Sequence, residues 1–116
     1  MRMQNEMGEI QISSEVFTTI TGAVATRCFG VKGMAGRAKE NGLVQLLRRE
    51  SMTKGVSVKP NEDGSITITL HIVVDHGVNL AALSESIMNE VSYKVSSATD
   101  IPVRQVDVFV DSMIID

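Results

Sequence analysis

Aromatic residues and cysteine are scarce in this sequence: it has no Trp, one Tyr, three Phe and a single cysteine, Cys28. Binders of single-stranded nucleic acid usually stack bases on aromatic side chains, so the shortage counts against that class. One cysteine excludes an internal disulfide, and the pattern around it favours packing over reactivity. No stretch reaches the roughly 20 apolar residues needed to cross a bilayer, and the N-terminus lacks a signal peptide. We therefore expect a cytoplasmic protein with no direct membrane insertion.

The bulk composition is that of one small folded domain. The chain has 116 residues, of which 43% are hydrophobic and 22% are charged, enough apolar material for a single core. We expect residues 1–7 to be a flexible N-terminal segment and residues 8–116 to form a single domain.

The net charge of −3 hides a division along the chain. Residues 27–54 contain seven basic and two acidic side chains, whereas residues 59–116 contain three basic and nine acidic ones. Such a division could create a surface for anions, or align copies of the protein basic end to acidic end; folding could equally intermix the charges. The candidate partner- or anion-binding residues are Lys32, Gly33, Met34, Arg37, Lys39, Arg48 and Arg49.

Hydrophobic periodicity predicts an α+β fold with the order β-α-α-β-β-α-β, its helices packed on one face of a mostly antiparallel sheet. Strands are expected at residues 9–12, 56–59, 66–74 and 106–110, with the second and third forming a hairpin. Ser13 and Asn79 are placed to cap helices that begin at residue 14 and residue 80. Four glycines between residues 30 and 42 indicate a loop, and a short second helix is expected over residues 43–51. The apolar run at residues 72–74 indicates a buried central strand, or a second sheet face covered by another copy.

Two groups of residues offer candidate chemistry. His71, Asp75 and His76 could bind zinc or relay a proton, but a strand rises about 3.3 Å per residue and separates His71 from Asp75 too far for one tetrahedral site. The glycines at 30, 33 and 36 match the glycine turn of KH-type RNA-binding modules, with Lys32, Arg37 and Lys39 to meet phosphates. We expect no catalytic residues, metal or cofactor, and keep a KH-like RNA-binding module as the alternative function.

Several blocks of sequence, taken together in this order, resemble the alkaline shock protein family of bacteria. They are GEIQIS at residues 8–13, GVKGM at 30–34, GVSV at 55–58, HGVNL at 76–80 and IPVRQVDVFV at 101–110. The stretch ENGLVQLLRRES at residues 40–51 resembles the short single-domain branch. His76 and Asp100 depart from the family pattern, which has Tyr at the first position and often Gly at the second.

The resemblance implies a non-enzymatic cytoplasmic protein linked to envelope stress and membrane-lipid homeostasis, which can be held at the membrane by a separate anchor protein. The family has no agreed catalytic residues, so none is carried over. The leading hypothesis is a scaffold or adaptor that self-associates into a homo-oligomer and docks another protein.

Overall fold

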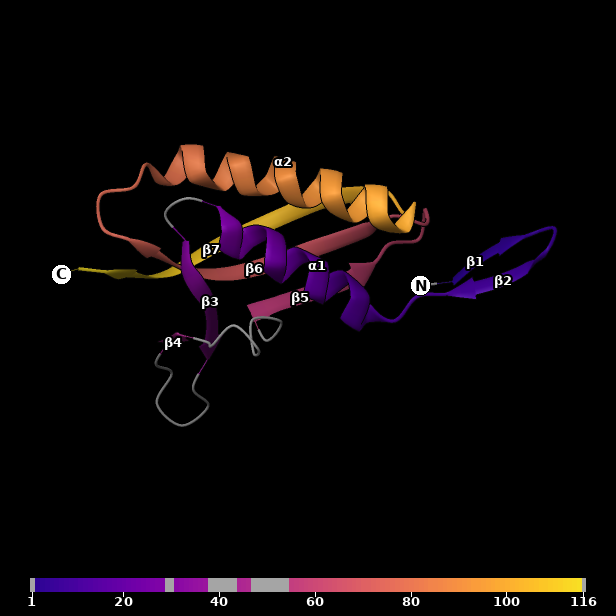
Figure 1. Cartoon of the computed structure of the whole chain (residues 1–116), viewed down its shortest axis with the longest axis horizontal. Coiled ribbons are helices and arrows are strands. Elements are labelled where there is room, and N and C mark those ends of the chain that lie inside the picture. The colour runs from indigo at the N-terminus through magenta and orange to yellow at the C-terminus, as the bar shows by residue number, and fades with distance from the viewer. Residues whose placement is uncertain (1, 29–30, 38–43, 47–54, 116) are drawn as a thin grey trace.

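A computed structural model describes residues 2–28, 31–37, 44–46 and 55–115 of the chain. Within them the fold is α+β, as predicted, with two helices, α1 (Ser14–Arg27) and α2 (Leu80–Thr99) (Figure 1). The described strands are β1 (Arg2–Asn5), β2 (Gly8–Gln11), β3 (Val31–Arg37), β4 (Val44–Leu46), β5 (Val56–Pro60), β6 (Ile66–Asp75) and β7 (Val103–Ile114). None of the helices in these ranges is long and apolar enough to cross a membrane.

Strand β6 is the centre of the main sheet, as its apolar run predicted. Along one edge it pairs antiparallel with β5, from Ile66 to Leu70, and then with β3, from Ile72 to Val74. Along its other edge it pairs with β7, and this pair is parallel. The sheet is therefore mostly antiparallel, as expected, with one parallel pair at the β7 side.

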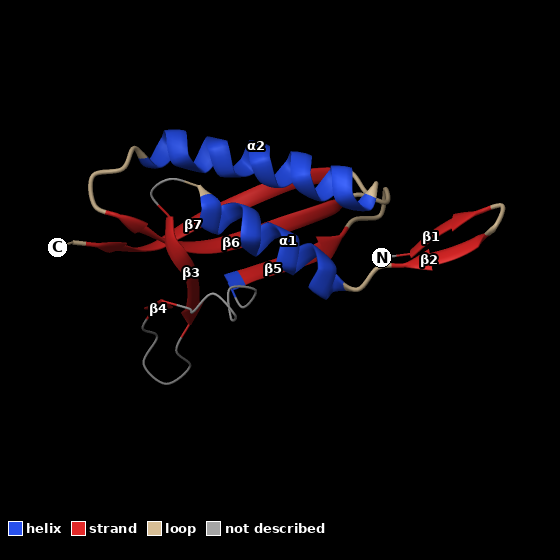
Figure 2. Ribbon diagram, in the orientation of Figure 1, coloured by secondary structure: helices blue, strands red, loops and turns tan. Residues whose placement is uncertain are grey.

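Both helices cover the same face of this sheet (Figure 2). The alternate side chains of β6 that point towards the helices are fully buried, and they meet Phe17 of α1 and the stripe Leu83, Ile87, Val91 and Val95 of α2. The buried side chains of β6 on this face are Ile66, Ile68, Leu70, Ile72 and Val74. Burying an aliphatic side chain contributes roughly 1.5–3 kcal/mol, so this layer holds the helices on the sheet.

The two helices begin differently. Asn79 caps α2 as predicted, because its side-chain oxygen accepts a hydrogen bond from the backbone N–H of Ala82 at 3.0 Å. Ser13 occupies the same place before α1, but its hydroxyl makes no capping bond, so that part of the prediction is wrong. The backbone carbonyl of Ser13 accepts from the N–H of Val16 at 3.1 Å instead.

Residues expected to form a loop and a second helix are strands where the structure describes them. Val31–Arg37 is β3, and its register against β6 shifts between Val31 and Gly33, a place where glycine suits a bulge. Val44–Leu46 is β4, paired antiparallel with β3, so the predicted helix over residues 43–51 is wrong there. A short apolar run is ambiguous between helix and strand, and the available strand edge decides. Residues 38–43 and 47–54 lie outside the described residues.

The N-terminal strands form a separate two-stranded antiparallel hairpin (Figure 1). Arg2–Asn5, within the segment expected to be flexible, is strand β1, and it pairs with β2. The domain boundary at residue 8 itself stays a prediction.

Candidate functional site

The face of the sheet turned away from the helices is polar and partly exposed. Thr67, Thr69 and His71 of β6 alternate with the buried core residues and are half-buried. On β7 the alternation is the same, with Val106 buried and Phe109 49% exposed. Val73, which follows on the same face of β6, is only 3% exposed, so this face is open around Phe109 and not along its whole length. An aromatic side chain exposed on such a face is a candidate contact for a partner.

His71, Phe109 and Asp111 form a side-chain cluster on this open face. The parallel register places His71 directly beside Phe109, and their rings stack with centroids 5.0 Å apart and an angle of 14° between the planes. The Nδ1 atom of His71 lies 2.9 Å and 3.1 Å from the two carboxylate oxygens of Asp111. When Nδ1 carries a proton it donates to Asp111, which fixes the orientation of the ring.

This cluster replaces the grouping that the sequence suggested. His71 pairs across the sheet with Asp111, and not with Asp75 or His76 further along its own strand and turn. His76 is exposed, and its backbone N–H donates to the carbonyl of Ile114 at 3.0 Å. Asp111 and Phe109 were missed as partners of His71. Their alternation with Val106, Val108 and Val110 does place them on one face, but only the observed pairing and register of β6 with β7 set them beside His71.

An imidazole held by a carboxylate can act as a base, but base catalysis also needs a positioned reacting group. Within the described part of the chain, the side-chain contacts found for His71 are with Asp111 and Phe109, and neither is a nucleophile that it could activate by removing a proton. Nor do the described residues contain a group of three or more His, Cys, Asp and Glu side chains that could hold a metal ion. What the geometry provides is one exposed aromatic ring, Phe109, which stacks on the half-buried ring of His71.

The edge of β7 is a second feature of this surface. β7 is 12 residues long and pairs with β6 along one side only, since no other described strand is hydrogen-bonded to it. A strand edge presents a row of backbone N–H and C=O groups that can pair with another chain. The register against β6 shifts between Ile66 and Thr67 and again between Ile72 and Val73. The longest regular stretch of β7, from Gln105 to Val110, therefore includes Phe109.

The predicted basic site is only partly described. Lys32, Gly33, Met34 and Arg37 fall in β3, whereas Lys39, Arg48 and Arg49 lie outside the described residues. The glycine turn on which the KH-like hypothesis depended is contradicted, because β3 runs through Gly33 and Gly36 where that hypothesis needs a turn between two helices. Whether the basic residues share a surface stays a prediction.

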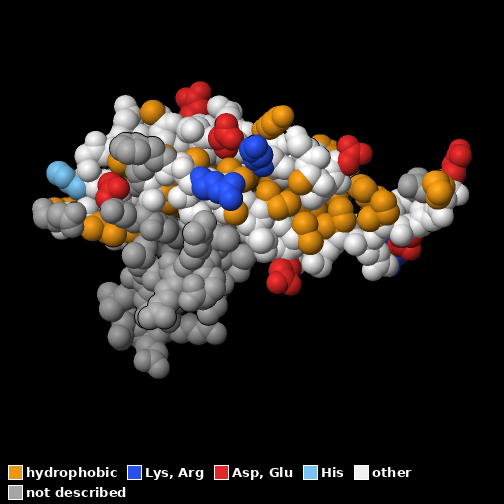
Figure 3. Space-filling model, viewed as in Figure 1, with side chains coloured by type: hydrophobic (Ala, Val, Ile, Leu, Met, Phe, Trp, Pro, Cys, Tyr) orange, Lys and Arg blue, Asp and Glu red, His pale blue; other side chains and the backbone are white. Residues whose placement is uncertain are grey.

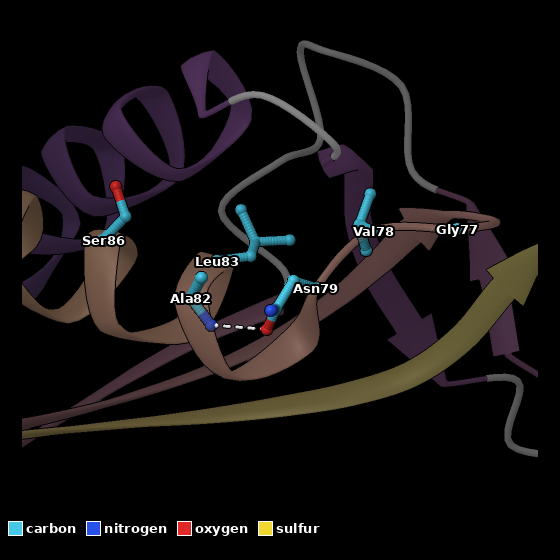
Figure 4. Close-up of a pocket in the computed structure, with 6 residues that line it drawn as sticks. All are labelled: Gly77, Val78, Asn79, Ala82, Leu83 and Ser86. Carbon is cyan, nitrogen blue, oxygen red and sulfur yellow. Dashed lines mark hydrogen bonds between the residues drawn. The ribbon is translucent and has the colours of Figure 1, made fainter.

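A cavity of about 400 Å³ lies at the start of α2 (Figure 4). Val78 and Leu83 point into it, and the remaining lining residues are Gly77, Asn79, Ala82 and Ser86. No lining side chain is charged, and Asn79 already occupies the amide of Ala82 that an anion would use at a helix N-terminus. The cavity is therefore a weaker candidate for recognition than the β7 edge.

Cys28 lies half-buried at the end of α1 and packs against the core, in agreement with its predicted role. Burial, and secondly the negative charge of Glu90, raise the pKa of its thiol. A raised pKa keeps the thiol protonated at neutral pH, which is the opposite of what a nucleophilic cysteine needs.

Three bacterial proteins, all described as uncharacterized, are similar to the chain over almost its whole length. YloU of Bacillus subtilis is 29% identical over 97% of this chain and 94% of its own length. Spy1614 of Streptococcus pyogenes is 32% identical over 97% of this chain and 93% of its own. Spy1535 of the same organism is 28% identical over 93% of this chain and 81% of its own.

A family model agrees with these similarities. Residues 2–115 match the model of the alkaline shock protein family, which is described as having a cell envelope-related function. This match confirms the resemblance drawn from the blocks between residues 8 and 110. The chain therefore belongs to the alkaline shock protein family, whose function is related to the cell envelope.

Proposed function

We propose that this protein is a non-catalytic adaptor of the bacterial cytoplasm, which docks another protein along β7 and also associates with copies of itself. The observation that carries the docking proposal is the 12-residue strand β7, paired on one side only among the described strands, with Phe109 exposed beside it. The cell envelope-related function of the family favours a membrane-anchored protein as the partner.

Strand addition explains why the surface has this form. An extended segment of the partner would hydrogen-bond to the outer edge of β7, and its side chains would contact Phe109, which stacks on His71 of β6 behind it. The backbone bonds would provide affinity, and the stacked rings would select an apolar or aromatic side chain at the matching position of the partner. Because His71 is held by Asp111, the ring pair is already ordered before binding.

Photocrosslinking in living cells tests this proposal. A photoreactive amino acid replaces Gln105, exposed on β7, or Asn89, an equally exposed position of α2 that serves as the matched control. We expect position 105 to yield a discrete adduct with another protein, position 89 to yield none, and Phe109→Lys to abolish the adduct at 105. Equal adducts at both positions, or an adduct unchanged by Phe109→Lys, would exclude docking along β7.

A further inference from the structure

We propose that the hairpin β1–β2 and the side of α1 that carries Val16 and Ile20 form the interface between two copies of this chain. In this interface each hairpin packs across the α1 helix of the other copy. This inference rests on the self-association in the proposed function and gives it a surface. That surface is separate from the β7 edge, so one molecule can bind its own copy and another protein at the same time.

The hairpin has little support within its own chain. Among the described elements, β1 and β2 contact mainly each other, and only Met3 and Ile12 near its base reach the core. The hairpin projects from the N-terminal end of α1, away from the main sheet (Figure 1). A two-stranded hairpin alone in water is marginally stable at best, because it has no layer to pack on. A second molecule would supply that layer.

One face of the hairpin is apolar and continues onto α1. Met3 and Ile10 are opposite each other in the β1–β2 register, and Ile12 follows Ile10 on the same face by alternation. On α1, Val16 and Ile20 are one turn apart, beside the buried stripe. Ile10 is 46% exposed and Val16 is 42% exposed. Met3, Ile12 and Ile20 are half-buried at the edge of the core. We call these five residues the apolar band; Figure 3 shows hydrophobic side chains gathered between α1 and the base of the hairpin.

The hairpin and helix α1 have similar lengths, measured from the residues that join them, and this suits a twofold arrangement. From the junction at residues 12 and 13, a strand reaches the hairpin tip in about 17 Å. From the same junction, α1 reaches Arg27 in about 21 Å. A twofold axis at the junction therefore lays each hairpin over most of the partner's α1, and the same patch serves both molecules, as a twofold interface requires.

The charges at the two ends of the apolar band are complementary. Glu6 is exposed at the hairpin tip, and Arg27 is exposed in the last turn of α1. The twofold arrangement brings Glu6 of each molecule to Arg27 of the other. Each end of the interface would then carry one pair of opposite charges. The ion pair of Arg2 with Glu9, at 2.6 Å, lies on the other face of the hairpin and stays within its own chain.

The same charges argue against a lipid surface as the occupant. Faces that lie on anionic membranes are rimmed by Lys and Arg, which meet the headgroups. On the hairpin and α1, the border of this band carries Glu6, Glu15 and Arg27, all exposed, while Arg2 and Glu9 pair with each other on the other face of the hairpin. A second copy, which offers Arg27 to Glu6, fits this border better.

A charge exchange followed by sedimentation velocity at low salt tests the interface. Glu6→Lys and Arg27→Glu each place like charges at both ends of a homodimer, so each variant alone should associate about tenfold more weakly than the native protein. When the two variants are mixed, both contacts join opposite charges again, and association should recover. If the native protein self-associates but the variants match it, or their mixture does not recover, the interface lies elsewhere and this inference fails while self-association stands.

The apolar band is tested with Ile10→Thr combined with Val16→Gln, against the control Met88→Gln on α2, where the side chain is similarly exposed at 37%. We expect the double variant to be monomeric and the control to associate normally, with circular dichroism showing native helix content in both. A native protein that stays monomeric at every concentration would overturn this inference and the self-association, but not the docking along β7. If the double variant associates normally and loses binding to phosphatidylglycerol vesicles, the band is a lipid surface and the inference is wrong.

Discussion

Thr21 is fully buried in α1, and its hydroxyl has no hydrogen-bond partner among the described residues. A buried polar group without a partner costs roughly 1–3 kcal/mol, whereas an apolar group of the same shape does not. We expect Thr21→Val to raise the free energy of unfolding by about 1 kcal/mol in urea denaturation. Thr26→Val is the control: its hydroxyl donates to the carbonyl of Gly22 at 2.9 Å, so its replacement should give no gain. A loss of stability in Thr21→Val would show that the Thr21 hydroxyl makes a hydrogen bond in the folded protein.

Cys28 should react slowly while the protein is folded. Burial and the charge of Glu90 raise the pKa of the thiol above its ordinary value of 9.0, so the reactive thiolate is rare at neutral pH. Alkylation by iodoacetamide, followed by mass spectrometry, should be slower than in the unfolded protein and should accelerate as the pH rises through and beyond that value. Glu90→Gln removes a charge that disfavours the thiolate, so it should increase the rate at a fixed pH. Fast labelling of the native protein at pH 7 would contradict this assignment.

The candidate site shows how far single residues can be predicted from sequence. His71 is identifiable as a potential functional group, and the β pattern correctly separates it from Asp75 by several residues along a strand. Its true partner, Asp111, is 40 positions away in sequence. The contact depends on the parallel pairing of β6 and β7 and on the register that sets His71 beside Phe109. No local pattern carries that information.

At the scale of elements, the two helix starts offer a direct comparison. Asn79→Ala removes a side chain that accepts a hydrogen bond from Ala82, so we expect it to lower the free energy of unfolding by about 1 kcal/mol. Ser13→Ala removes a hydroxyl that makes no capping bond, so we expect it to lower the free energy of unfolding by only a few tenths of a kcal/mol. Thermal or urea unfolding measures both. Equal losses would mean that Ser13 caps α1 in solution after all.

Elements with long, regular patterns were predictable, and short ones were not. The 20 residues of α2 repeat apolar side chains every three or four positions, and the β5–β6 hairpin alternates around a turn rich in Asn, Asp and Gly. Val44–Leu46 has only three residues, too few to distinguish a strand from a helix turn. β3 contains Gly33 and Gly36, which weaken any strand pattern, and it exists because β6 offers a free edge beyond Leu70.

At the scale of the whole molecule, the two faces of the main sheet differ. Both described helices lie on one face of the sheet and bury the core (Figure 2). On the opposite face Phe109 is exposed, and no described strand pairs with the outer edge of β7. The hairpin and α1, which carry the apolar band, lie away from this edge (Figure 1). The proposed adaptor function needs two separate contact surfaces, and these two sides of the molecule are the candidates for them.

Amide hydrogen exchange across β7 in the photocrosslinked complex tests the central proposal most directly, because strand addition must protect backbone N–H groups. We predict that alternate amides between Val103 and Val110, those not bonded to β6, exchange rapidly in the free protein and slowly in the complex, while amides of α2 exchange at the same rate in both. Unchanged exchange across β7, with protection appearing at the helices instead, would contradict docking by strand addition.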